Sequence, residues 1–137
     1  MRKINKLIIH CSGTPPHKDF TAEDIKDWHV NGNGWSDIGY HYIVKLDGSL
    51  EYGRPVNVSG AHCKGQNKHS IGICYIGGMD KTMEHWEDTR TPKQTESLLQ
   101  LLNVLKKFHP GAKIHGHRDF SKKDCPSYDA ANEYKNI

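Results

Sequence analysis

Apolar and polar positions along the chain predict strands and helices in mixed order. The run Leu7–Ile9 is short, apolar and rich in β-branched residues, which indicates a buried strand that a Ser-Gly-Thr-Pro-Pro segment ends. Asp47-Gly48 is a typical two-residue hairpin turn, and alternation predicts a strand on each side of it. The strands expected from these patterns span residues 4–11, 40–46, 49–52, 70–76 and 112–116.

Two segments carry helix signals. Thr21 offers a capping hydroxyl, acidic residues follow in the first turn, and Ile25 and Trp28 lie three apart, so a short helix is expected from residue 22 until the Asn-Gly-rich segment 31–34. Thr91-Pro92 begins a clearer helix with one apolar face, formed by Leu98, Leu101, Leu102, Leu105 and Phe108. Hairpins among the strands argue against an all-parallel sheet, so the sequence predicts an α/β fold with a mixed central β-sheet flanked by helices.

Length and charge favour one small domain. A chain of 137 residues buries about 68% of its unfolded surface around a single core, so residues 1–137 are expected to form one domain. The net charge of +3 suits approach to an anionic polymer but is weak support for nucleic-acid binding. No apolar stretch reaches membrane-spanning length, and the N-terminal apolar run is too short for a signal peptide. We therefore expect synthesis in the cytoplasm, no membrane partner and a monomer.

The four cysteines differ in their surroundings. Cys11 and Cys74 lie beside strand-forming residues and are expected to be small buried hydrophobes, whereas Cys125 lies in a polar segment before a proline. Without a signal peptide or a small-domain spacing pattern, all four are expected to be reduced.

Three side chains suggest a metal site. His10 ends a predicted strand, and His117 and Cys125 flank a later polar loop. Two imidazoles and one thiolate supply three bonds to zinc and leave a fourth position for water. Spacing alone does not choose His117 over His115, and a closed structural site would need a fourth ligand such as His115 or Asp124.

Nine other polar or aromatic residues are expected to have structural rather than functional roles. Five histidines are expected to be hydrogen-bonded or solvent-facing, and three aromatic residues and one arginine are expected in structural roles rather than as groove walls. The histidines are His17, His29, His69, His85 and His109, and the other four residues are Trp35, Tyr42, Tyr52 and Arg54. Segment 79–90, which contains Trp86, is expected to be a long loop.

The chain resembles the type 2 N-acetylmuramoyl-L-alanine amidases, which include small phage lysozyme amidases and peptidoglycan recognition proteins. The resemblance runs in order from residue 8 to about residue 129. It is carried by Ile8-Ile9-His10-Cys11-Ser12, Gly34-Trp35-Ser36-Asp37-Ile38-Gly39-Tyr40-His41-Tyr42, Gly60-Ala61-His62-Cys63-Lys64-Gly65 with Asn67, Ser70-Ile71-Gly72-Ile73 and His117 through Tyr128.

The resemblance implies roles for six residues. It implies that His10, His117 and Cys125 bind one zinc ion, that Tyr40 and Lys123 are the catalytic partners, and that His62 lines the substrate groove. The implied reaction is hydrolysis of the amide between N-acetylmuramic acid and L-alanine of the peptidoglycan stem, with a zinc-activated water as nucleophile.

Two other functions are compatible with these residues. One is a module that binds peptidoglycan or muropeptides without cutting them, and another is a regulatory protein that binds a protein partner. We favour a phage or prophage lytic enzyme, which acts on the wall after release from the cytoplasm. Action on cytoplasmic muropeptides stays possible.

Overall fold

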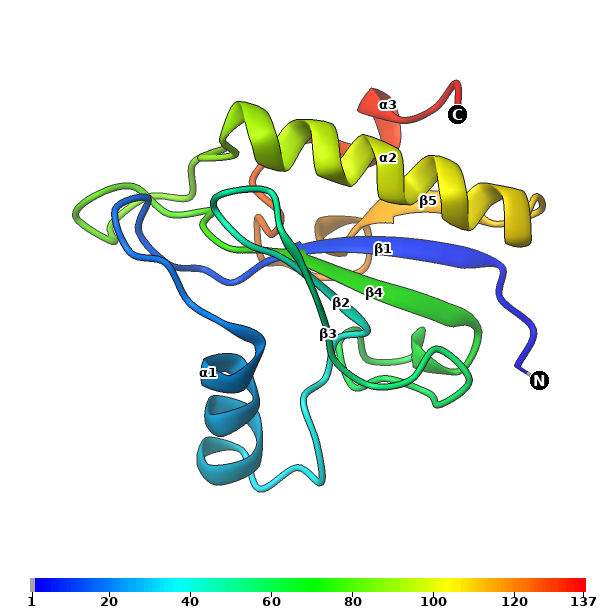
Figure 1. Ribbon diagram of the computed structural model, residues 1–137, viewed down its shortest axis with the longest axis horizontal. Helices are drawn as coiled ribbons and strands as arrows, with labels where there is room; N and C mark the ends of the chain where they lie inside the picture. The colour runs from blue at the N-terminus through cyan, green and yellow to red at the C-terminus, as the bar shows by residue number, and fades with distance from the viewer. Residues whose placement is uncertain (1) are drawn as a thin grey trace.

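The computed structural model describes residues 2–137 as one five-stranded sheet with helices on both sides (Figure 1). The strands are β1 (Lys6–Cys11), β2 (Tyr42–Val44), β3 (Leu50–Tyr52), β4 (Ser70–Tyr75) and β5 (Lys113–Gly116). The α-helices are α1 (Ala22–Asp27), α2 (Pro92–Phe108) and α3 (Ala130–Glu133), and other helical turns lie at η1 (Trp28–Gly32), η2 (Asn67–His69) and η3 (His117–Asp119).

The sheet is mixed, as the hairpin signal predicted. Its strand order is β3-β2-β4-β1-β5. β1 pairs in parallel with both β4 and β5, β2 pairs in parallel with β4, and only β3 pairs antiparallel, with β2. The parallel strands bring their carboxyl ends to one edge of the sheet, where β1 carries His10.

Strand alternation divides the core between the two faces of the sheet. Leu7 and Ile9 point to the face that α2 covers and pack with Leu98 and Leu102. The opposite face packs Ile25 of α1 against a second apolar cluster, which contains Ile38, Ile43, Cys74 and Ile76. Figure 1 shows α2 along the first face and α1 on the other side.

Both predicted helices begin at the expected caps. Thr21 forms a reciprocal capping box with Asp24, and Thr91 forms one with Gln94. The strand expected over residues 40–46 is shorter, Tyr42–Val44, and the helix after Asp27 continues as the π-helical turn η1. The segment that was expected to be a plain loop, 79–90, contains an antiparallel bridge between Met79 and Trp86.

The four cysteines are buried free thiols. Within residues 2–137, no helix has the length and apolar character needed to cross a membrane.

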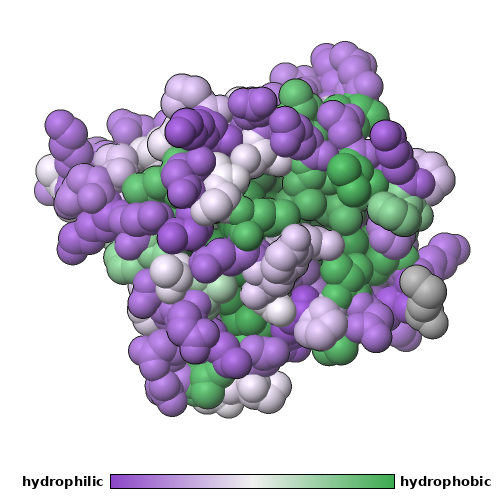
Figure 2. Space-filling view, in the orientation of Figure 1, coloured by the Kyte–Doolittle hydropathy of each residue, from purple (hydrophilic) through white to green (hydrophobic). Residues whose placement is uncertain are grey.

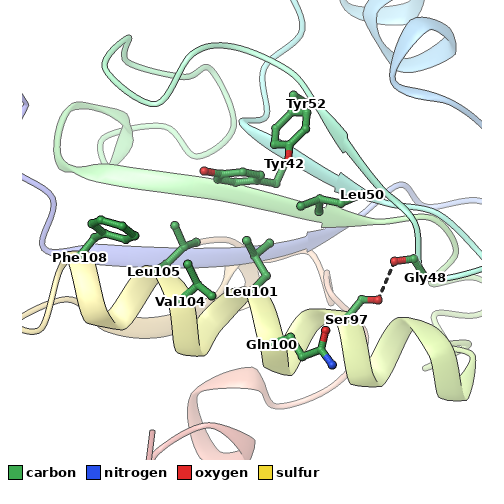
Figure 3. A pocket seen from close by; sticks show the side chains of 10 residues that line it. All are labelled: Tyr42, Gly48, Leu50, Tyr52, Ser97, Gln100, Leu101, Val104, Leu105 and Phe108. Carbon is green, nitrogen blue, oxygen red and sulfur yellow. Dashed lines mark hydrogen bonds between the residues drawn. The ribbon is translucent and has the colours of Figure 1, made fainter.

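An apolar groove of about 430 Å³ separates α2 from the β2–β3 hairpin (Figure 3). Phe108 and Val104 of α2 line one wall, and Tyr42, Leu50 and Tyr52 line the other. Figure 2 shows apolar side chains gathered on this face. Tyr52 is 71% exposed, so the core role expected for it is wrong. None of the six residues implied as site residues lines this groove.

Candidate active site

The register of the parallel strands brings two of the predicted ligands together. Ile9 of β1 lies opposite Gly116 of β5, so the next residues, His10 and His117, lie side by side where the strands end. Their ring centroids are 4.5 Å apart. His115 lies opposite Ile8, about 6.6 Å further back along the strand, and its ring pairs with Asp119. The register therefore brings His117, rather than His115, beside His10, which favours His117 as the second predicted ligand.

Cys125 completes a three-residue cluster with these histidines. One ligand atom from each of His10, His117 and Cys125 lies within 4.8 Å of the other two. The backbone N–H of Cys11 donates to the Cys125 sulfur at 3.2 Å, which stabilises negative charge on that sulfur. Two nitrogen donors and one sulfur donor are a set that zinc accepts, so the residues present fit this metal.

The segment that carries Cys125 is anchored to β4 and to the loop that follows β4. The hydroxyl of Tyr75 on β4 donates to the Pro126 carbonyl at 2.7 Å. The hydroxyl of Ser127 donates to the Gly78 carbonyl, also at 2.7 Å. Because both anchors lie directly after Cys125, they hold this part of the chain, and with it the sulfur, beside the histidines.

The two residues considered as a fourth ligand lie outside this cluster. Asp124 is exposed and forms an ion pair with Arg118, and His115 pairs with Asp119. Within residues 2–137, the cluster of side chains that could hold a metal ion consists of three residues, His10, His117 and Cys125. The cluster is therefore open on one side, which suits catalysis better than a purely structural role.

A pocket of about 260 Å³ opens over the cluster and brings in Tyr40 and Lys123. The Tyr40 ring is 5.0 Å from the His10 ring, between centroids, and burial raises the pKa of its phenol well above the ordinary value. Lys123 lies in an exposed loop and lines the same pocket. Burial and the charge of Lys123 lower the pKa of His117. A protonated phenol and an ammonium group thus face the predicted ligands.

His62 also lies at this pocket, bonded to a predicted ligand. Its Nδ1 is 2.8 Å from Nε2 of His10, and its Nε2 is 3.1 Å from the Ser70 hydroxyl. Burial lowers the pKa of His62 to about 3 and holds the pKa of His10 well below its usual range. Both imidazoles are therefore neutral at pH 7, the state in which imidazole binds a metal.

Three further residues of the pocket wall were not predicted to belong to the site. Trp35 is 37% exposed and Trp86 is 38% exposed, and both line the pocket. His29 is hydrogen-bonded as expected, because its Nδ1 accepts from the Gly39 N–H at 2.8 Å, but it lines the pocket too. The core role expected for Trp35 is therefore wrong. In the sequence, Trp86 stands among charged residues of segment 79–90, and this position is the signal that could have marked it as a residue of the pocket wall.

The remaining groove candidates lie elsewhere. Tyr42 and Tyr52 line the apolar groove beside α2. Arg54 donates to the carbonyl oxygens of Ile38 and Ser59 and so holds loop backbone, which agrees with the structural role expected for it.

Comparison with known proteins agrees with this geometry. The family model described as N-acetylmuramoyl-L-alanine amidase matches residues 1–128. The chain belongs to the N-acetylmuramoyl-L-alanine amidase family. It is 40% identical over 123 residues to the endolysin of Escherichia phage T7, covering 90% of this chain and 80% of that protein. It is 33% identical to peptidoglycan-recognition protein SC1a of Drosophila melanogaster, covering 94% and 70%.

Solved structures place this amidase in the same fold. The amidase LysC from Clostridium intestinale superimposes with a TM-score of 0.81 at 29% identity, covering 96% of this chain and 82% of that one. A Drosophila PGRP-LB variant in complex with tracheal cytotoxin gives 0.80 at 27% identity, covering 99% and 82%. The expected family, the expected fold and an amidase activity on peptidoglycan are confirmed.

Proposed function

We propose that this amidase is zinc-dependent and cleaves the amide between the lactyl group of N-acetylmuramic acid and L-alanine of the stem peptide. The observation that carries the proposal is the open cluster of His10, His117 and Cys125, whose donor atoms lie within 4.8 Å of one another. The family description supports the bond, because it names that amide.

The residues around the cluster supply what amide hydrolysis requires. When bound, zinc provides a water of lowered pKa and polarises the substrate carbonyl. Tyr40 keeps its proton and donates a hydrogen bond toward the oxygen on which negative charge develops. Lys123 places its ammonium group at the same pocket and stabilises that charge. The neutral state of His10, held by burial, leaves one ring nitrogen available as a ligand.

The substrate we propose is peptidoglycan or a muropeptide derived from it. Endolysins of several phages and peptidoglycan-recognition proteins are among the relatives, and two similar structures hold tracheal cytotoxin. We infer a lytic role in which the protein, a monomeric single domain over residues 1–137, is made in the cytoplasm and acts on the wall after release. Nucleic acid and membrane are not part of the proposal.

The deciding experiment is mass spectrometry of the products from purified peptidoglycan. Zinc-loaded protein is expected to release free stem peptides that begin with L-alanine, and Cys125→Ala is expected to release none. Glycan strands that keep their stems, from folded and zinc-loaded protein, would contradict the proposal and favour a binding module. Products cut at another bond would contradict only the assignment of the amide.

A further inference from the structure

A chain of hydrogen bonds leads from the metal cluster into the protein interior. Nε2 of His10 lies 2.8 Å from Nδ1 of His62, and Nε2 of His62 lies 3.1 Å from Oγ of Ser70. All three residues are buried, with exposed fractions of 1%, 9% and 0%. The chain ends on β4, in the centre of the sheet.

The backbone is built to receive the His62 ring in one orientation. A Cβ added to Gly72 would lie 2.6 Å from the ring, and one added to Gly60 would lie 2.8 Å from it. Two glycines thus leave room for the imidazole against β4 and the preceding loop. The Asn67 side chain accepts from the backbone N–H groups of His62 and Cys63, both at 2.9 Å, and so fixes the loop that carries the ring.

Both ring nitrogens of His62 have protein partners, so neither is left for a hydrogen bond to substrate. The hydrogen bond between His62 and His10 also limits which ring nitrogen of His10 can bind a metal. Its Nε2 faces His62, and Nδ1 is therefore the nitrogen left to bind a metal. A metal-bound nitrogen carries no proton, so the proton of His10 lies on Nε2 and is donated to Nδ1 of His62.

We propose that His62 is a positioning residue that fixes the tautomer and ring orientation of His10 for metal binding, with Ser70 fixing His62 in turn. This inference rests on the proposed function, because it assumes that His10 is a metal ligand. In this role His62 acts through His10 rather than on the substrate, which differs from the expected role of lining the substrate groove.

The first test is zinc affinity, measured by competition with a chromophoric chelator. His62→Ala is expected to weaken zinc binding by about 10- to 100-fold, the usual effect of removing a partner of a metal-bound histidine. His62→Asn is expected to retain most of the affinity, because Oδ1 of asparagine takes the position of the histidine Nδ1. Ser70→Ala is expected to give a smaller loss. His17→Gln is the control, because His17 is exposed and outside the pocket.

The second test separates positioning from substrate contact. Cobalt absorption is expected to shift in His62→Ala and to return toward the parent spectrum in His62→Asn. With saturating zinc, KM for peptidoglycan is expected to change less than twofold in His62→Asn. Long-range ¹H–¹⁵N spectra of the zinc-loaded parent are expected to show the His10 proton on Nε2.

Four outcomes would overturn the inference. Unchanged zinc affinity in His62→Ala together with a raised KM would make His62 a substrate-binding residue and leave the proposed function intact. A His10 proton on Nδ1 would contradict the tautomer. A parent protein that binds no zinc would overturn both the inference and the proposed zinc dependence. If His62→Ala fails to fold, the test uses His62→Asn and Ser70→Ala instead. A parent-like zinc affinity in Ser70→Ala together with a tenfold loss of zinc affinity in His62→Asn would contradict the inference.

Discussion

Tyr40 and Lys123 offer two different ways to stabilise charge at the same pocket. Tyr40 lies 5.0 Å from His10, between ring centroids, and burial raises the pKa of its phenol, so in the proposed mechanism it donates a hydrogen bond to the developing oxyanion and keeps its proton. Lys123 adds a full positive charge from an exposed loop. Removing either donor is expected to lower kcat by about a hundred- to a thousandfold, the usual cost of losing a group that stabilises an oxyanion.

The measurement is kcat for Tyr40→Phe and Lys123→Ala, with zinc content determined for each preparation. Both variants are expected to keep their metal, because neither side chain belongs to the predicted ligands. Lys122→Ala is the matched control, since Lys122 is an exposed neighbour that does not line the pocket. Parent-like turnover in a fully loaded variant would remove that residue from the mechanism.

Trp86 is expected to act on binding rather than on chemistry. Its ring is 38% exposed and lines the pocket from segment 79–90, where the bridge to Met79 holds it. Trp86→Ala should raise KM for peptidoglycan by about two- to thirteenfold, which corresponds to the 0.5–1.5 kcal/mol of a stacked aromatic contact, while kcat changes little. Phe108→Ala is the control, because Phe108 is exposed on α2 away from the pocket. An unchanged KM would show that the Trp86 ring makes no substrate contact.

The sequence identifies residues with distinctive chemistry better than residues that form a wall. His10 and Cys125 stand out because a histidine at a strand end and a cysteine in a polar loop are unusual. The choice of His117 needed the β1–β5 register, which no spacing within one strand reveals. The geometry of a loop places Trp35 at the pocket, and hydrophobic periodicity does not predict loop geometry.

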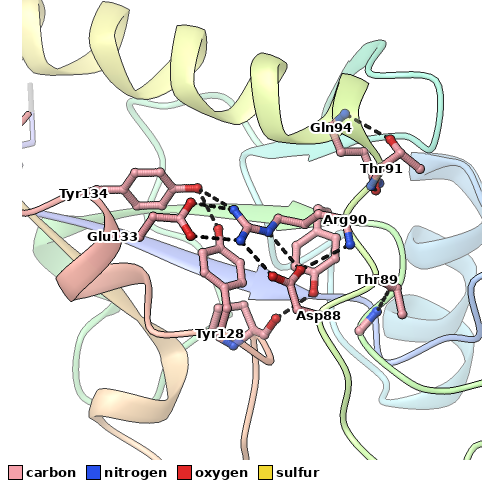
Figure 4. A network of polar contacts seen from close by, with 11 residues as sticks. Asp88, Thr89, Arg90, Thr91, Gln94, Tyr128, Glu133 and Tyr134 are labelled. Atoms are coloured by element: carbon pink, nitrogen blue, oxygen red, sulfur yellow. Dashed lines mark hydrogen bonds and ion pairs between the residues drawn. The ribbon is translucent and has the colours of Figure 1, made fainter.

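At the scale of elements, Arg90 connects two parts of the chain that are distant in sequence, the end of segment 79–90 and residues 128–134 (Figure 4). Its guanidinium pairs with Asp88 and with Glu133 of α3, and it lies 3.4 Å above the centre of the Tyr128 ring. Tyr128 follows Cys125 by three residues, so this network holds the end of segment 79–90 against the segment that carries the predicted sulfur ligand.

Arg90→Ala is expected to lower the free energy of unfolding by about 1–3 kcal/mol, because charged hydrogen bonds and a cation–π contact are lost together. Arg90→Lys should recover part of this loss, since an ammonium group does not form the two-pronged contacts of a guanidinium. Urea unfolding of both variants checks the prediction. Arg118→Ala serves as the control, because its partners Asp124 and Asp129 are more than half exposed. Equal midpoints for Arg90→Ala and the parent would contradict a clamping role.

Elements with a capping box or a clear turn signal were predictable, whereas the bounds of β2 and the presence of α3 were not. The helix that begins after Thr91 has both a capping box and a continuous apolar face, and it lies where these signals place it. The strand at Tyr42–Val44 has three residues, and the predicted range was longer because alternation continues past the last paired residue. α3 has four residues and is defined by its packing beside β5 rather than by its own pattern.

At the scale of the whole molecule, the sheet separates stability from function. Both faces of the sheet bury apolar clusters, whereas the carboxyl ends of the strands collect polar rings. His10, His41 and His62 are each at least nine-tenths buried. A small domain therefore carries several imidazoles that it must keep neutral in order to remain folded.

This arrangement predicts that the metal-free protein loses stability in mild acid. Burial lowers the pKa of His10 and His41 and lowers that of His62 to about 3, whereas the unfolded chain restores values near 6.5. Below pH 6.5 the unfolded chain therefore binds protons that the folded chain does not. The free energy of unfolding is fully retained above that pH and falls by up to about 1.4 kcal/mol per pH unit for each such histidine as the pH drops toward the folded pKa values.

Urea midpoints of chelator-treated protein at pH 8, 7, 6 and 5 measure this slope. They should be similar at pH 8 and 7 and should then fall steeply. His62→Asn removes one of the titrating groups, so its curve is expected to be flatter between pH 6 and 5, whereas His17→Gln is expected to follow the parent because His17 is exposed. A parent midpoint that stays constant from pH 8 to 5 would show that these imidazoles accept protons in the folded state, which contradicts their burial as neutral rings.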